Sequence, residues 1–70
     1  MMPLSMVRTG EPNSIVKISG RAETRQFLEN LGFVPGCPVT VITETGGNVI
    51  VSIRESRVAI SREMASKIFV

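Results

Sequence analysis

Cys37 is the side chain of this 70-residue sequence best suited to nucleophilic or metal chemistry. A reactive cysteine needs a base or a cation beside it, and a structural zinc site needs about four Cys or His ligands. The chain has no histidine and no second cysteine, and Cys37 stands between Gly36 and Pro38 with no Lys or Arg within several positions. We therefore expect Cys37 to be a packing residue at a turn, and we predict no catalytic residue, no cofactor and no metal site.

The acidic residues do not form a pair suited to general acid–base catalysis. They are spread along the chain as Glu11, Glu23, Glu29, Glu44, Glu55 and Glu63. The glycine pair before Asn48 lacks the spacing and the following lysine of a phosphate-binding loop. The sequence therefore predicts that the protein is not an enzyme, while weak contact of surface carboxylates with a divalent ion such as Fe²⁺, Mn²⁺ or Zn²⁺ stays open.

Three arginines, Arg54, Arg57 and Arg62, could lie near one another at one end of a small barrel. The net charge is only +2, however, and the three phenylalanines fall at apolar-face positions while Tyr and Trp are absent. Domains that bind single-stranded nucleic acid combine a basic groove with aromatic side chains that stack on the bases. No nucleic-acid partner is expected, and a nucleic-acid-binding small barrel remains an alternative.

The chain shows no repeat, no low-complexity tract and no linker, so residues 1–70 are expected to form a single domain. A lone thiol is typical of a reducing compartment, and the N-terminus does not combine a charged start with the long apolar run of a signal peptide. No segment reaches the roughly 18–20 apolar residues of a membrane span. We expect a cytoplasmic protein that is not itself embedded in a membrane.

One helix is predicted for residues 22–31, where apolar side chains recur at helical spacing. Gly32 directly after it suits the left-handed position that ends a helix, and Phe33 would make the closing hydrophobic contact. The Val-Pro-Gly run at 34–36 favours a tight turn, because proline presets φ and glycine accepts a positive φ. This part of the sequence therefore turns a helix into a strand.

Short strands account for most of the remainder. The β-branched run at 15–18 predicts a first strand, and the alternation from Cys37 onward places Val39, Val41 and Thr43 on one face. The later elements are expected to be a hairpin turn at 46–48, a return strand with Val49, Val51 and Ile53 on one face, a tight connection at 54–57, a strand at 58–60, a helical turn at about 62–67 capped by Ser61, and a strand at 68–70.

The predicted fold class is all-β dominated. We expect a small SH3-like β-barrel of about five short strands, with one inserted α-helix at about 22–31 and a short C-terminal helical turn at about 62–67. A strongly bent barrel both buries the apolar face of so short a sheet and protects its edges.

The predicted helix and the corner after it carry more apolar residues than a one-helix lid needs on its inner side. Some of these residues could therefore face outward as a docking patch for another protein. The candidate partner-binding residues are Phe27, Leu28, Leu31, Phe33 and Val34. The alternative is that all five belong to the core.

Two long segments, RAETRQFLENLGFVPGCPVTVI and NVIVSIRESRVAISREMASKIFV, resemble the FeoA family of small bacterial ferrous iron transport proteins. The order, the spacing and the length agree over nearly the whole chain. The resemblance implies an SH3-like barrel in the cytoplasm that binds FeoB, a membrane transporter for Fe²⁺ with a cytosolic GTP-binding domain, and modulates it without catalysis. Similar domains lie at the C-terminus of DtxR-type repressors, so a metal-sensing regulatory module is a further alternative.

Overall fold

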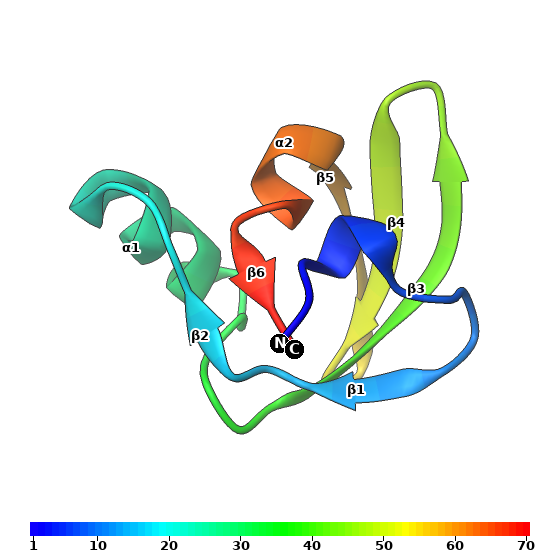
Figure 1. Ribbon diagram of the computed structural model, residues 1–70, viewed down its shortest axis with the longest axis horizontal. Helices are drawn as coiled ribbons and strands as arrows, with labels where there is room; N and C mark the ends of the chain where they lie inside the picture. Colours follow the sequence, from blue (N-terminus) through cyan, green and yellow to red (C-terminus); the bar gives the residue numbers. More distant parts are fainter.

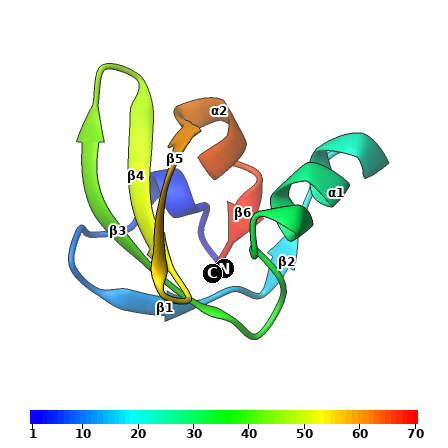
Figure 2. The same cartoon turned by 180° about the vertical axis from the view of Figure 1, so that it is seen from behind.

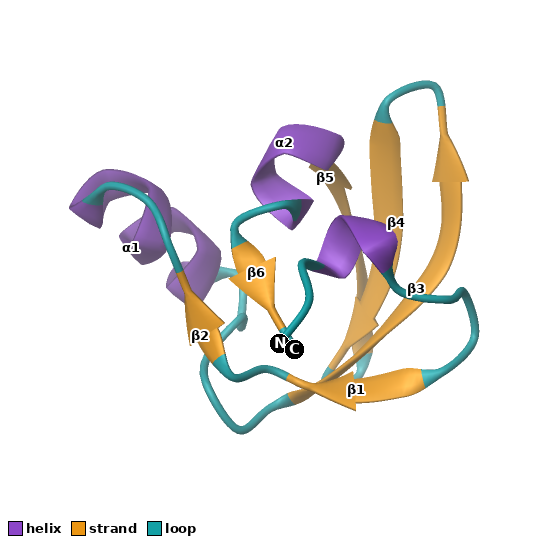
Figure 3. Cartoon of the chain, viewed as in Figure 1, coloured by secondary structure: helices purple, strands orange, loops and turns teal.

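Short antiparallel strands dominate the computed structural model, which describes residues 1–70 (Figure 1). Four strands form one sheet in the order β1-β3-β4-β5, and β2 and β6 form a second, two-stranded sheet. Helix α1 lies at the outside of the molecule, whereas η1 and α2 lie between β6 and the four-stranded sheet, as the colouring by secondary structure shows (Figure 3). The elements are a 3-10 turn η1 (Leu4–Met6), β1 (Pro12–Ser14), β2 (Lys17–Ile18), α1 (Ala22–Asn30), β3 (Pro38–Thr45), β4 (Asn48–Ile53), β5 (Ser56–Ser61), α2 (Arg62–Ala65) and β6 (Ile68–Phe69).

The hairpin of β3 and β4 forms at the predicted glycine pair. Gly46 and Gly47 both have positive φ, 53° and 85°, which is the backbone of a type I′ turn. The inward side chains of the two strands are fully buried, as the alternation predicted: Val39, Val41, Val49, Val51 and Ile53.

The predicted face of Thr43 is wrong. The register of β3 against β4 shifts between Val41, which pairs with Val51, and Thr43, which pairs with Ile50. Ile42 is thus the extra residue of a β-bulge, and a one-residue slip turns every later side chain to the opposite face. Thr43 is exposed for this reason.

The first strand is also placed differently from the prediction. The β-branched run at 15–18 does not form one strand, because the chain crosses from one sheet to the other at Ile15. The N–H of Ile15 donates to the carbonyl of Cys37 in the larger sheet, and the N–H of Val16 donates to the carbonyl of Phe69 in the smaller one. The strand β1 comes earlier, at residues 12–14, where pairing with β3 outweighs a poor intrinsic β propensity.

The end of α1 follows the prediction closely. Gly32 has φ 109°, its N–H donates to the carbonyl of Glu29 at 2.9 Å, and the N–H of Phe33 donates to the carbonyl of Leu28 at 3.0 Å. This pair of hydrogen bonds is a Schellman motif, and its usual hydrophobic contact joins Leu28 to Phe33. The second helix is capped as expected, since the N–H of Met64 donates to Ser61 Oγ at 3.1 Å, but it is shorter than predicted.

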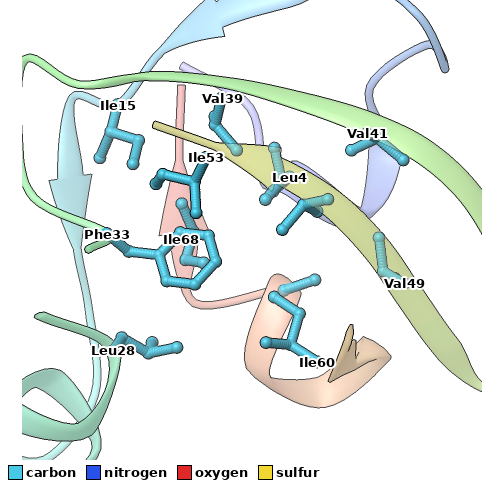
Figure 4. Close-up of a cluster of buried hydrophobic side chains, with 12 residues drawn as sticks. Leu4, Ile15, Leu28, Phe33, Val39, Val41, Val49, Ile53, Ile60 and Ile68 are labelled. Carbon is cyan, nitrogen blue, oxygen red and sulfur yellow. The ribbon is translucent and has the colours of Figure 1, made fainter. Parts of the chain in front are cut away.

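One apolar core lies between the two sheets and the helices (Figure 4). It contains no buried polar or charged side chain. The chain ends meet beside it, because Met2 and Val70 exchange two backbone hydrogen bonds of 2.9 Å. The four-stranded sheet does not close on itself, so β5 remains an open edge. The core residues are Leu4, Ile15, Leu28, Phe33, Val39, Val41, Val49, Val51, Ile53, Ile60, Ala65 and Ile68.

Candidate partner-binding site

The five candidate partner-binding residues divide into two groups. Leu28 and Phe33 are fully buried, with no exposed surface, so the expectation that these two side chains offer surface to a partner is wrong. Leu31 and Val34 are half-buried, and Phe27 is 50% exposed. Docking of a partner on this region remains a prediction, and only Phe27, Leu31 and Val34 can contribute surface to it.

The Schellman motif explains why Leu28 and Phe33 are internal. It directs Phe33 back toward Leu28, and both side chains point into the core that also contains Ile68 (Figure 4). Consecutive helical residues are rotated by about 100°, so Phe27 points away from the direction that Leu28 takes. Hydrophobicity alone could not distinguish these neighbours, because both are large apolar residues.

Helix α1 is attached to the body mainly at its two ends. At its start, a Cβ atom on Gly20 would lie 3.2 Å from Lys67 Cδ, and the N–H of Ser19 donates to the carbonyl of Lys67 at 2.8 Å. At its end, a Cβ atom on Gly32 would lie 3.3 Å from Arg54 Nε. Seven of its nine residues are exposed, and the helix lies at the outside of the molecule (Figures 1 and 2).

We call Phe27, Leu31 and Val34 the α1 surface. Phe27 and Leu31 are four residues apart on the helix and therefore lie side by side. Val34 follows the turn at Gly32, and its N–H donates to the carbonyl of Gly32 at 3.0 Å. The α1 surface thus consists of a large exposed aromatic ring and two half-buried aliphatic side chains near the C-terminal end of α1, on a backbone fixed by hydrogen bonds.

Cys37 has a neighbour that sequence position did not reveal. Arg54 Nη2 donates to Cys37 Sγ at 3.6 Å, although the two residues are 17 positions apart. The tight turn between β4 and β5 brings the guanidinium there, with Arg54 at φ 55°. Cys37 is half-buried and packs against the core, which agrees with a packing role.

The structure does not bring a set of chemically active side chains together. No three His, Cys, Asp or Glu side chains gather as a metal site would require, and the surface has no pocket for a small ligand. None of the helices has the length and apolar character of a membrane span. The arginines do not form one cluster, because Arg54 and Arg62 lie beyond opposite ends of β5 and Arg62 contacts Glu44 at 3.8 Å.

The sequence model of the FeoA domain matches residues 2–70. The chain belongs to the FeoA family. It is 36% identical over 70 residues to a protein of Methanocaldococcus jannaschii that carries the provisional name Fe(2+) transport protein A, covering 100% of this chain and 85% of the relative. A crystal structure of an iron uptake regulatory protein, FeoA, superimposes with a TM-score of 0.87 at 29% identity, covering 96% of this chain and 91% of the other.

Two further solved structures have the same fold as this FeoA-family chain. Stenotrophomonas maltophilia FeoA, described as a prokaryotic SH3 domain protein and solved with zinc, has a TM-score of 0.84 at 20% identity over 97% of this chain and 87% of the other. A manganese-dependent transcriptional repressor has a TM-score of 0.86 at 19% identity, and its matching part is 38% of that protein. The predicted small SH3-like fold is confirmed, as a partly open form of the barrel.

Proposed function

We propose that this FeoA-family protein is a non-catalytic accessory protein of ferrous iron transport that binds the cytosolic GTP-binding region of a FeoB-type transporter and modulates it from the cytoplasmic side. Family membership supports the link to ferrous iron transport. The provisional name of the Methanocaldococcus jannaschii relative points the same way.

The observation that carries the proposal is the exposed ring of Phe27 on a helix held at both ends. An aromatic side chain on a fixed backbone loses little conformational entropy on binding, and such residues often dominate the binding energy of an interface. The charged residue nearest to Phe27 on the same face of α1 is the exposed Glu23, four residues before it, whereas Arg25 is two residues before Phe27 and faces away. The α1 surface is therefore suited to a protein partner that offers an apolar pocket.

The proposal is tested by NMR titration of the ¹⁵N-labelled protein with the cytosolic domain of the FeoB-type transporter from the same genome. Chemical shift changes are expected in residues 22–34. Phe27→Ala should weaken binding by roughly 5- to 30-fold, which corresponds to about 1–2 kcal/mol.

Ile42→Ala is the matched control, because Ile42 is 37% exposed and belongs to β3, a strand labelled on the opposite side of the molecule from α1 (Figure 1). It also removes exposed apolar surface, and it should leave the affinity within about twofold. Equal affinities of the two variants would exclude the α1 surface as the docking site, and the absence of binding by the unmodified chain would refute the proposed function.

A further inference from the structure

Strand β5 is an unpaired edge of the four-stranded sheet. It pairs with β4 over all six of its residues without a register shift, and no strand lies on its other side (Figure 2). Neither Arg57 nor Ala59 makes a backbone hydrogen bond outside the β4–β5 ladder, and both residues are exposed. A continuous strand edge of this kind is a template to which another chain can pair.

The direction of the backbone groups along β5 follows from the turn before it. Arg54 and Glu55 form a two-residue connection, so the flanking residues Ile53 and Ser56 are the hydrogen-bonded pair that closes the hairpin. Pairs alternate along an antiparallel ladder, and Val58 is therefore hydrogen-bonded to β4. The N–H and C=O groups of Arg57 and Ala59 point outward.

The other edges of the two sheets are shorter or blocked. Strand β1 has three residues and begins with Pro12, which has no N–H to donate, and β2 has two residues. Proteins protect their edges with proline, lysine, bulges or very short strands. Strand β5 contains none of these, and Arg57 is its only charged residue.

We propose that the outer edge of β5 binds an extended acidic segment of a partner protein by strand addition. The partner strand pairs with the outward N–H and C=O groups of Arg57 and Ala59, which is the recognition mode of β-augmentation. The guanidinium of Arg57 is exposed and forms no ion pair within the chain, so it is free to meet a carboxylate on the added strand. The half-buried side chain of Val58 gains cover on the core face.

A second copy of this chain fits the edge less well than an acidic segment does. Arg57 is the only charged residue of β5, so a second copy offers this edge no carboxylate to pair with the guanidinium. In an antiparallel pair centred on Arg57, the two arginines would face each other, and like charges destabilise cross-strand pairs. The charges of the edge thus select a partner with acidic side chains.

The first measurement is amide hydrogen exchange of the free protein by NMR. The amides of Val58 and Ile60 should exchange slowly, and those of Arg57 and Ala59 should exchange quickly. Slow exchange of the Arg57 and Ala59 amides at low protein concentration would contradict the assignment of β5 as an open edge. Protection that rises with protein concentration would overturn the proposal by assigning the edge to a second copy.

The second measurement adds a blocked peptide, Thr-Val-Glu-Val-Glu-Val-Thr, and a control peptide in which lysine replaces glutamate. The glutamate peptide should slow exchange at Arg57 and Ala59 by tenfold or more, and the lysine peptide should not. Equal protection by both peptides, or by neither, would overturn the proposal. Because the probe is a peptide, this outcome is separate from the fate of the proposed transporter interaction.

Two variants test the mode of binding. Ala59→Pro removes an outward N–H donor without removing a hydrogen bond to β4, so it should lower the affinity for the glutamate peptide about 5- to 10-fold. Ala59→Val keeps the N–H, so its affinity for the glutamate peptide should remain within twofold of that of the unmodified chain. Arg57→Glu should reverse the preference between the two peptides. An unchanged affinity of a folded Ala59→Pro or an unchanged preference of Arg57→Glu contradicts strand addition.

Discussion

Truncation of Leu28 should impair folding, whereas truncation of its neighbour Phe27 should impair binding. Leu28→Ala removes a side chain with no exposed surface and leaves a cavity beside Phe33, which costs about 2–5 kcal/mol. A domain of this size has a free energy of unfolding of roughly 4–10 kcal/mol. Leu28→Ala therefore removes a large part of the stability.

Phe27→Ala creates no cavity, because the ring is 50% exposed and its site is open to water. Alanine also has a helix propensity about 0.5 kcal/mol better than that of phenylalanine, which offsets part of the lost contact. The expected loss of unfolding free energy is below about 1 kcal/mol. The folded variant then reports on binding, whereas a substitution at Leu28 reports on folding.

The assay is urea unfolding followed by far-UV circular dichroism, since the chain has no Trp or Tyr for fluorescence. The midpoint should fall strongly for Leu28→Ala and slightly for Phe27→Ala, with an unchanged slope against urea. A loss of unfolding free energy for Phe27→Ala as large as that for Leu28→Ala would refute the assignment of Leu28 to the core and of Phe27 to the surface. It would mean that α1 packs through its other face.

Two other substitutions test the corner that follows α1. Gly32→Ala should lower the unfolding free energy by about 1–3 kcal/mol in the same assay, because φ is 109° and the new Cβ lies 3.3 Å from Arg54 Nε. Gly36→Ala is its control: φ is 91° there but no atom lies within 4 Å, so a loss equal to that of Gly32→Ala would show that the Arg54 contact is irrelevant. Cys37→Ser should change stability by less than about 1.5 kcal/mol and leave partner affinity intact, and loss of binding by the folded variant would assign the thiol a function.

Residues close together in the sequence were enough to predict the end of α1, the β3–β4 hairpin and the inward side chains of β4. Gly32 followed by Phe33 identified the end of α1, because only an αL residue with a hydrophobic successor completes that motif. The glycine pair at 46–47 identified the β3–β4 hairpin, since both residues need positive φ. The inward residues of β4 followed from the two-residue period of a strand.

Long-range pairing decided the parts that could not be predicted. Strand β1 forms at Pro12–Ser14 because β3 offers it backbone partners, and nothing in its own residues favours a strand. The bulge at Ile42 leaves no compositional mark, so the faces of β3 were predicted correctly only as far as Val41. The contact of Arg54 with Cys37 depends on a turn 17 residues away. In each case the determining partner is distant in sequence.

The sequence located the apolar residues of the candidate site but could not show which of them are exposed. A hydrophobic pattern locates the apolar residues of a helix, yet the boundary between core and surface depends on where the helix is anchored. Leu28 is the only fully buried residue of α1, and Phe33 after the helix is fully buried as well. Of the five candidate residues, only those of the α1 surface therefore remain accessible to a partner.

The two proposed surfaces are neighbours at one point of the fold. Gly32, at the end of α1, lies against Arg54, which precedes β5 by two residues. A partner domain docked on the α1 surface would therefore hold any flexible acidic segment of its own close to the β5 edge. Such tethering raises the effective concentration of the segment to the millimolar range, which makes even a weak strand pairing contribute to affinity. Because the interior is entirely apolar packing, both proposals rest on the side chains and backbone groups that the core leaves outside.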